Sequence, residues 1–213
     1  MLSRFHLECW KKKRSVPLEQ ISDSFHIIVS GRARIERINE ETGRTITLFL
    51  FAPGDVFDLL QLLTNSPCDG ILVAIDDLHL LTIQVKEARQ WISAHPEFNL
   101  SFLPYLGQQI RTLAHLSGDL ALHDTETRLA HLIMRHLDRK KDGHFHIRLI
   151  NDLSHEVLAG MIGSVRAVVN RQLQHWRKKG FIHLDHGHIH IDKMEVLLKR
   201  TDNLHLPAPE GKE

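Results

Sequence analysis

The stretch LSHEVLAGMIGSVRAVVNRQLQHWRKKGFI, residues 153–182, constrains the fold of this chain more than any other. Ser154 precedes apolar residues at helical spacing, which predicts a first short helix with Ser154 at its N-cap. Gly163 permits a tight backbone turn that residues with a side chain disfavour, and Ser164 can then cap a second helix. Gly180 can end this second helix as its C-terminal glycine. The stretch therefore predicts two short helices that meet at a tight turn.

The second helix separates an apolar face from a polar face. Apolar residues recur at intervals of four, four and three, so they should pack inward. These residues are Val165, Val169, Leu173 and Trp176. The opposite face places polar side chains in the first turns, where a recognition helix meets the edges of DNA bases. The predicted base-contacting residues are Arg166, Ala167, Asn170 and Arg171.

The charge distribution of this region favours a DNA-binding surface. Between Val157 and Leu184 there are five Lys or Arg residues and no acidic residue, so phosphates would meet a surface of one sign. Arg177, Lys178 and Lys179 form the C-terminal end of the helix, where phosphate contacts are expected. The net charge of the whole chain is only +1, so any DNA binding must be local. An ordinary helical hairpin with a solvated basic face is the alternative.

Length and composition limit the class of protein. The 213 residues allow one large or two small domains. Two cysteines, Cys9 and Cys68, are too few for a disulfide scaffold and are typical of a reducing cytoplasm. No apolar run approaches the roughly 20 residues that span a bilayer, and the first residues lack the core of a signal peptide. A cytoplasmic protein without a membrane partner is expected.

Alternation of apolar and polar residues predicts a sheet in the first half of the chain. Strands are expected over residues 25–29, 33–38, 45–51, 71–75 and 78–85, with a short helix over 56–63. Many short strands with tight turns indicate a closed or rolled antiparallel sheet.

After residue 85 the apolar period lengthens. Residues 86–94 are amphipathic, and Pro96 can begin a long helix that reaches a hinge at residues 122–123. Its apolar stripe follows alternating intervals of three and four, which favours a parallel dimer over packing along its own sheet. The seam residues are Leu103, Leu106, Ile110, Leu113, Ser117 and Leu120.

The last part of the chain completes a winged domain. Asp124 can cap a further helix, whose inward residues are Leu129, Leu132, Ile133 and Leu137. Residues 144–149 alternate as a strand, and residues 181–184 and 188–192 predict a hairpin, named the wing here. His183 and His188 in the wing can donate to phosphates. A metal site formed by the wing histidines, His183, His186, His188 and His190, is the weaker interpretation. The tail from Asn203 is expected to be disordered.

Three motifs occur in the order seen in one known family. They are SGRARI at 30–35, FAPGDVF at 51–57 and LSHEVLAGMIGSVRAVVNR at 153–171, and with them the chain resembles the CRP/FNR superfamily of bacterial transcription regulators. The resemblance implies an α+β fold: an antiparallel β-roll sensor domain (1–95), a dimerisation helix with a hinge (96–123), a winged helix-turn-helix domain (124–202) and a tail (203–213). It implies a homodimer that reads a two-fold-symmetric operator in double-stranded DNA, with RNA polymerase as a partner and no enzymatic activity.

The residues expected to line the effector pocket of this chain differ from those of the family members that bind cyclic nucleotides. Those members carry a Gly-Glu pair for the ribose and an Arg-Ser pair for the cyclic phosphate, where this chain has Asp58-Leu59 and Cys68-Asp69. Loss of the Arg removes the cation that pairs with phosphate, and Asp69 adds a like charge. The two positions that meet the purine from the dimer helix are Leu113 and Ala114 here. Cyclic AMP is therefore not expected to be the effector.

The recognition helix also departs from the commonest pattern of the family. That pattern has a Glu directly after the Arg, where it accepts from cytosine N4. Ala167 offers only a methyl group, which can contact a thymine methyl but cannot accept a hydrogen bond. An altered half-site is expected.

Other effector chemistries of the family can be compared with the residues present. An iron-sulfur cluster needs four cysteine ligands, and two cannot supply them. A haem sensor with Cys9, His79 or another His as a ligand stays open, although no spacing marks a ligand pair. A thiol switch at Cys68 is likewise open beside a plain small buried cysteine, and no cofactor is predicted. A dimeric sensor whose winged domain mainly contacts protein is the alternative function.

Overall fold

The computed structural model describes residues 4–66, 68–139, 145–185, 188–199 and 201. It divides into two compact units, Met1–Leu116 and Ser117–Glu213. The long helix α3 (Asn99–Leu122) begins in the first unit and ends in the second. Within the described residues, no helix combines the length and the apolar character that crossing a membrane requires.

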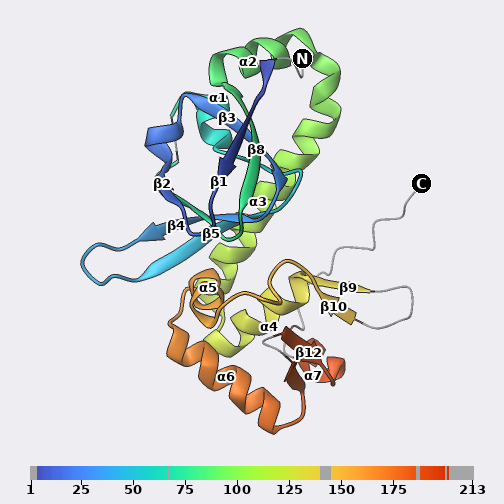
Figure 1. The fold of residues 1–213 in the computed structure, drawn as a ribbon. Helices are drawn as coiled ribbons and strands as arrows, with labels where there is room; N and C mark the ends of the chain where they lie inside the picture. Colours follow the sequence, from blue (N-terminus) through green and yellow to red (C-terminus); the bar gives the residue numbers. More distant parts are fainter. Residues whose placement is uncertain (1–3, 67, 140–144, 186–187, 200, 202–213) are drawn as a thin grey trace. The chain divides into compact units, whose positions relative to one another are not determined.

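The first unit contains two four-stranded antiparallel sheets (Figure 1). One sheet has the order β1 (His6–Trp10), β8 (Leu78–Gln84), β3 (Ser24–Ser30) and β6 (Val56–Phe57). The other has the order β2 (Ser15–Pro17), β7 (Ile71–Ala74), β4 (Ala33–Ile38) and β5 (Thr45–Phe51). The helices of this unit are η2 (Leu18–Ile21), α1 (Leu59–Thr64), α2 (Val85–Ala94), η3 (Pro96–Phe98) and the first part of α3.

The expected strands of the β-roll are confirmed, and two parts of the prediction need correction. The helix expected over residues 56–63 begins later, because Val56 and Phe57 pair with β3 and only the residues after Asp58 are helical. The long helix begins at Asn99, since Pro96 opens a short 3-10 helix first. Residues 6–17, which no pattern assigned, supply β1 and β2.

Strand β3 shows why one sheet is covered on both faces. His26 and Ile28 point into the core that joins the two sheets, where His26 stacks on Phe57 with 4.6 Å between ring centroids. Phe25 and Ile27 point the other way and pack with apolar residues of α2 and α3. Successive side chains of a strand alternate between the two faces of its sheet. Since both faces are covered here, the side chains on each face of β3 must be apolar or aromatic.

The second unit contains a helical core and two small hairpins (Figure 1). Its elements are α4 (Thr125–Arg135), β9 (Leu137–Arg139), β10 (Phe145–Ile147), α5 (His155–Met161), α6 (Arg166–Lys178), β11 (Ile182–Asp185), β12 (His188–Ile191) and α7 (Met194–Lys199). The predicted wing is the antiparallel pair β11 and β12. Its turn at residues 186–187 and the tail from Asn203 lie outside the described residues.

Two predictions for the second unit are wrong in detail. Leu137 was expected on the inward face of a helix, but α4 ends at Arg135 and Leu137 begins β9. The strand expected up to Leu149 ends at Ile147, because Leu149 has a φ of 61°, which no extended strand accommodates. Asp124 caps α4 as predicted and accepts from the Thr127 amide at 2.8 Å.

Candidate nucleic-acid interface and effector pocket

The first helix of the motif forms as its sequence predicts. The Ser154 hydroxyl accepts from the Val157 amide at 3.3 Å and caps α5, and both Leu158 within α5 and Ile162 at its C-cap are buried. Gly163 follows with a φ of 60°. That conformation suits glycine, because a side chain there crowds the backbone.

The start of α6 differs from the prediction. Ser164 was expected to cap this helix, but Val165 is the N-cap residue and no side chain caps it. Instead the Ser164 amide closes the turn by donating to the Ala159 carbonyl at 2.9 Å. Val165 is consequently extended and 47% exposed, so it does not join the inward face. Val169, Leu173 and Trp176 are fully buried as predicted.

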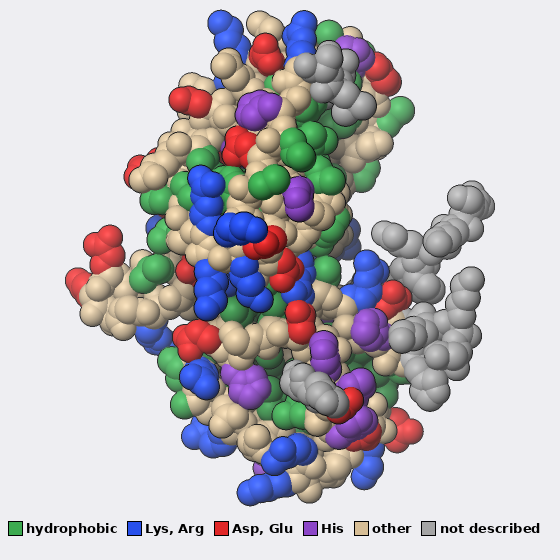
Figure 2. Space-filling view, in the orientation of Figure 1, with side chains coloured by type: hydrophobic (Ala, Val, Ile, Leu, Met, Phe, Trp, Pro, Cys, Tyr) green, Lys and Arg blue, Asp and Glu red, His purple; other side chains and the backbone are tan. Residues whose placement is uncertain are grey.

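The outward face of α6 carries the predicted contact residues. Arg166, Ala167, Asn170 and Arg171 are all exposed, as are Arg177, Lys178 and Lys179 at its end. Figure 2 shows Lys and Arg side chains along the part of the second unit that α6 occupies. No acidic residue lies in the first turn of α6, and its uncapped amides are oriented to meet an anion. The surface suits a phosphate backbone beside base edges.

Helix α4 holds the two motif helices in place through polar contacts that the sequence did not reveal. Arg128 donates from Nη1 to the Ile162 carbonyl at 2.8 Å, at the end of α5. The Trp176 indole of α6 donates from Nε1 to Glu126 Oε1 at 2.7 Å. Buried donors must find partners, so these two contacts fix where α5 and α6 lie on α4.

The wing presents its histidines without a metal-binding arrangement among the described residues. His183 and His188 are exposed, and Figure 2 shows histidine side chains gathered over this part of the second unit. His183 Nδ1 lies 2.7 Å from Asp192 Oδ1, and its ring stacks on His190 with 4.8 Å between centroids. In the part of the chain that the structure describes, three potential ligands converge elsewhere, at Asp119, His123 and His131.

The Asp119 carboxylate of that group is already occupied by other side chains. Asp119 accepts from His131 Nδ1 at 2.7 Å and from Arg135 Nη2 at 2.5 Å, and the Asp119 and His131 side chains are almost fully buried. The guanidinium neutralises the carboxylate that a metal ion would need. The arrangement therefore ties the end of α3 to α4, and no spacing in the sequence pointed to it.

Two of the residues expected at the cassette positions, Asp58 and Cys68, lie side by side. Asp58 has a φ of 58°, is buried, and accepts from the amides of Gln61 and Cys68, each at 3.4 Å. Burial raises the pKa of Asp58. Asp69 is exposed and lies 3.6 Å from Arg37, and Leu59 packs against the apolar cluster under α2. Leu113 and Ala114 are exposed on α3 of the single chain.

The two cysteines have different surroundings. Burial raises the pKa of the Cys68 thiol, and the carboxylates of Asp58 and Asp69 raise it further. A thiolate is disfavoured there, which argues against a thiol switch. Cys9 lies directly across from His79 in the pairing of β1 with β8, and both are exposed. This neighbourhood of the two candidate haem ligands could not be found from their spacing in the chain.

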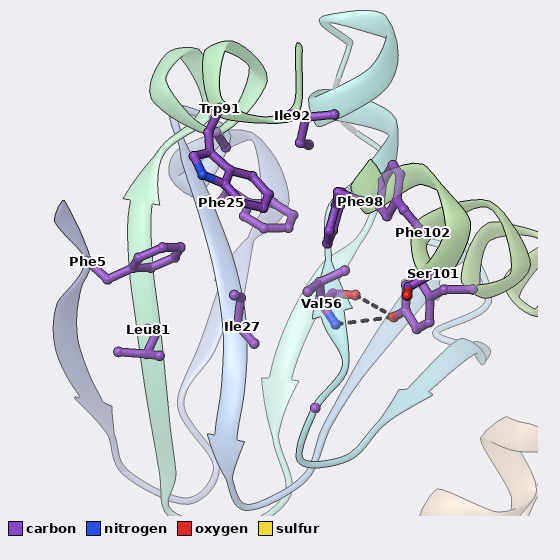
Figure 3. Close-up of a pocket in the computed structure, with 13 residues that line it drawn as sticks. Phe5, Phe25, Ile27, Val56, Leu81, Trp91, Ile92, Phe98, Ser101 and Phe102 are labelled. Atoms are coloured by element: carbon purple, nitrogen blue, oxygen red, sulfur yellow. Dashed lines mark hydrogen bonds between the residues drawn. The ribbon is translucent and has the colours of Figure 1, made fainter. Parts of the chain in front are cut away.

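The first unit also contains a cavity of about 410 Å³ that is separate from the cassette residues, named the aromatic cavity here (Figure 3). Six aromatic side chains line it: Phe5, Phe25, Trp91, Phe98, Phe102 and Tyr105. The Tyr105 hydroxyl donates to the Val56 carbonyl and accepts from the Val56 amide, both at 3.1 Å. Strands β3 and β8 form one side, and α2, η3 and α3 form the other.

The predicted dimer seam is mostly exposed in the single chain. Leu103 is 61% exposed and Ile110 is 68% exposed, and Leu113, Ser117 and Leu120 are also exposed. Leu106 differs, because it packs against the chain's own apolar cluster around Phe102. A leucine and isoleucine stripe of this kind is typical of a surface that meets another protein chain.

Two known protein families match this chain, one over most of the first unit and the other within the second unit. The family described as cyclic nucleotide-binding domain matches residues 19–95, and the family described as Crp-like helix-turn-helix domain matches residues 127–200. A "CRP-like cAMP-activated global transcriptional regulator" of Mycobacterium tuberculosis is 27% identical over 181 residues, which are 84% of this chain and 80% of that protein. A "Global nitrogen regulator" of Nostoc sp. is 27% identical over 186 residues, which are 84% and 81% of the two chains.

Solved structures share the fold. A CooA variant from Carboxydothermus hydrogenoformans has a TM-score of 0.77 at 20% identity and covers 93% of this chain and 88% of its own. FixK2 from Bradyrhizobium japonicum has a TM-score of 0.70 at 14% identity, with coverage of 92% and 96%. The arrangement of sensor sheet, long helix and helix-turn-helix, together with both family matches, identifies the chain as a member of the CRP/FNR family of DNA-binding transcription regulators.

Proposed function

We propose that this chain acts as a homodimer that binds a two-fold-symmetric operator through α6, and that its sensor unit does not bind a cyclic nucleotide. One observation carries the DNA-binding part: the outward face of α6 is basic, exposed and free of acidic residues over its whole length. Operator binding by such a dimer would place RNA polymerase beside it as the functional partner.

The exposed residues of α6 divide into two groups by position. Arg166 and Arg171 lie in the first two turns and carry forked donors that suit guanine O6 and N7. Asn170 can pair with adenine, and Ala167 can contact a thymine methyl. Positive side chains at the end of α6 and exposed histidines of the wing are assigned to phosphates. They are Arg177, Lys178, Lys179, His183 and His188.

A selection from random duplex DNA tests this proposal. The full-length protein should enrich a two-fold-symmetric motif whose half-site centres lie about one helical turn, roughly 10 base pairs, apart. Footprinting on the enriched duplex should then protect both half-sites. Recovery of no motif, with equal binding to all duplexes, would contradict sequence-specific recognition and favour the protein-contact alternative.

The dimer is supported by the exposed stripe on α3. Its residues follow the alternating three and four spacing of a helix that pairs with a copy of itself, and they are leucine or isoleucine at most positions. A two-fold operator also requires two copies of α6 related by symmetry. Both requirements are met by pairing α3 with α3 of a second chain.

The absence of cyclic-nucleotide binding is supported by the charges of the cassette. A cyclic phosphate there would meet the Cys68 thiol and the Asp69 carboxylate in place of a guanidinium and a hydroxyl, with the Asp58 carboxylate beside Cys68. Like charges in a partly buried pocket repel strongly. Calorimetric titration with cyclic AMP and cyclic GMP at micromolar concentration should show no saturable heat, whereas a clear isotherm would overturn this part of the proposal.

A further inference from the structure

The aromatic cavity concentrates side chains that are scarce in this chain. Four of the nine phenylalanines, one of the three tryptophans and the single tyrosine line it. These side chains come from the segment before β1, from β3, and from α2, η3 and α3, so five parts of the first unit converge on one space. At about 410 Å³ the cavity falls within the range of sites that hold small organic ligands.

The aromatic rings are arranged as walls with a gap between them. Trp91 and Phe98 meet edge to face at 5.2 Å, and Phe98 stacks on Phe102 at the same separation. In Figure 3 these rings project from the helices toward Phe25 and Ile27 of β3. Trp91, Phe98 and Phe5 are only partly buried, so a ligand that fills the gap would remove their apolar surface from water.

The polar groups of the cavity define the charge of the ligand. The lining residues include no Lys or Arg, so an anion would find no pairing cation. Tyr105 is neutral, because burial and the nearby Asp55 carboxylate raise its pKa to about 12. Asp55 is the acidic group next to this hydroxyl, and its charge disfavours a carboxylate or a phosphate. Ser101 supplies a hydroxyl at the exposed edge.

The same lining disfavours two other classes of ligand. Haem iron is held by an axial His, Cys, Met or Tyr, and of these the lining contains only Tyr105. Its hydroxyl is engaged with Val56 and its pKa is raised to about 12, so the tyrosinate that would ligate iron is disfavoured. A cyclic nucleotide needs a cation for its phosphate. A neutral one- or two-ring aromatic molecule needs only apolar walls and one weak polar contact, which this cavity offers.

We propose that the aromatic cavity is a binding site for a neutral aromatic molecule of one or two rings, distinct from the cassette around Asp58. Phe102 and Tyr105 place the start of α3 in its wall, and Tyr105 also ties α3 to Val56. A ligand packed against these residues therefore acts on the helix that carries the seam. The role of this ligand as an effector rests on the proposed regulatory function. The binding of the ligand to the cavity does not depend on that function.

The binding test uses 2-naphthol as the probe and the three tryptophan indoles as reporters. Trp10 lies in the core between the sheets and Trp176 lies in the second unit, so only Trp91 touches the cavity. In nitrogen-15 spectra of the full-length protein, titration should shift the Trp91 indole signal saturably and leave the other two in place. No saturable shift at Trp91, or shifts of equal size at all three indoles, would overturn the site.

A matched ligand tests the predicted charge selectivity. 2-Naphthoate has the same rings with a carboxylate in place of the hydroxyl, and this carboxylate finds no cation in the lining. It should bind about tenfold or more weakly than 2-naphthol, because a desolvated anion without a partner is costly. Equal affinity of the two probes would contradict the assignment of a neutral ligand.

A matched pair of variants tests the location. Ser101→Phe places a ring at the exposed edge of the cavity, whereas Ser93→Phe adds the same ring on the exposed surface of α2, outside the lining. Ser101→Phe should weaken 2-naphthol binding about tenfold or more, and Ser93→Phe should leave it unchanged. Wild-type affinity in Ser101→Phe would overturn the location. If Ser101→Phe does not fold, the wild-type indole pattern decides the question alone.

A last measurement separates this site from the proposed DNA-binding function. The indole titration contains no DNA, so its failure would leave operator binding untouched. With the selected operator, 2-naphthol should change the affinity of the wild type about fivefold or more and that of Ser101→Phe not at all. Unchanged operator affinity alongside an intact Trp91 shift would overturn the effector role of the cavity.

Discussion

Arg171 in the second turn of α6 and Lys178 at its end are both exposed, and they should contribute differently to DNA binding. Arg171 lies in the second turn, where a recognition helix contacts base edges. Lys178 is the last residue of α6, beside two further positive residues. A base contact carries discrimination between sequences, whereas a phosphate contact does not.

Arg171→Ala should weaken binding to the selected operator by about 1–3 kcal/mol and leave non-specific binding almost unchanged. Lys178→Ala should weaken both DNAs equally and reduce the salt slope by about one unit for each phosphate that is no longer neutralised. Fluorescence anisotropy over a range of salt concentrations measures both effects. An equal weakening on the two DNAs for Arg171→Ala would mean that this residue contacts phosphate.

His26 should make the stability of the first unit depend on pH. Burial lowers the pKa of His26 from 6.5 to about 4, so the folded chain takes up this proton only at lower pH than the unfolded chain does. The unfolded state therefore binds more protons between pH 6.5 and pH 4, and stability falls as the pH falls through this window. The full difference between the two pKa values of His26 corresponds to about 3 kcal/mol in the free energy of unfolding.

The variant His26→Phe keeps a ring that can stack on Phe57 but removes the titrating group. Burial also lowers the pKa of His136 to about 4, and this group is present in both proteins. Urea unfolding at pH 7.5 and at pH 5 should therefore show a loss of stability on acidification that is about 2 kcal/mol larger for the wild type than for the variant. The same pH dependence in both proteins would assign the effect to other groups.

At the scale of elements, the turn between α5 and α6 depends on a glycine for two separate reasons. Gly163 has a φ of 60°, and a Cβ added there would lie 2.5 Å from Cδ2 of Leu120. Gly180, after α6, has a φ of 66° but open space around its Cβ position. The two glycines therefore form a matched pair that separates backbone conformation from steric contact.

Gly180→Ala should destabilise the protein by about 1–2 kcal/mol, which is the cost of the left-handed conformation for a residue with a side chain. Gly163→Ala should cost about 1 kcal/mol more, because Leu120 must move away from the new methyl group. Thermal unfolding followed by circular dichroism compares the two. A smaller destabilisation for Gly163→Ala would show that Leu120 adapts without cost.

For the whole molecule, the exposed stripe on α3 decides whether the chain is one part of a dimer. Ile110 lies in the middle of this stripe, and Gln108 is exposed almost opposite to it on the same helix. A carboxylate introduced at either position has the same charge. Only the one in the stripe would be desolvated by a second chain.

Ile110→Glu should dissociate the dimer, because an unpaired charge buried in an interface costs several kcal/mol, about 3–5 by comparison with broken buried ion pairs. Gln108→Glu should remain dimeric. Sedimentation velocity at micromolar concentration distinguishes the two species. A dimer with unchanged stability for Ile110→Glu would remove this face of α3 as the interface.

Elements with local signals could be predicted from the amino-acid sequence. Caps at Ser154 and Asp124 and the glycine at position 163 were readable because each depends on the conformation of a few neighbouring residues. The alternation of the β-roll strands and the buried positions Val169, Leu173 and Trp176 of α6 were readable for the same reason, since burial follows the period of the element, whereas Val165 at the N-cap was predicted wrongly. The basic face of α6 followed directly from that period.

Contacts between distant segments were decided only by the tertiary structure. Strands β1 and β2 carry no clear period, and they form because β7 and β8 offer them edges to pair with. Val165, and not the predicted Ser164, is the N-cap residue of α6, because the turn closes onto α5 through the Ser164 amide. The aromatic cavity is lined by residues that range from Phe5 to Tyr105. The spacing of these residues along the sequence does not show that their side chains line one cavity. Such a space exists only once sheet and helices are packed, because their separation sets its volume.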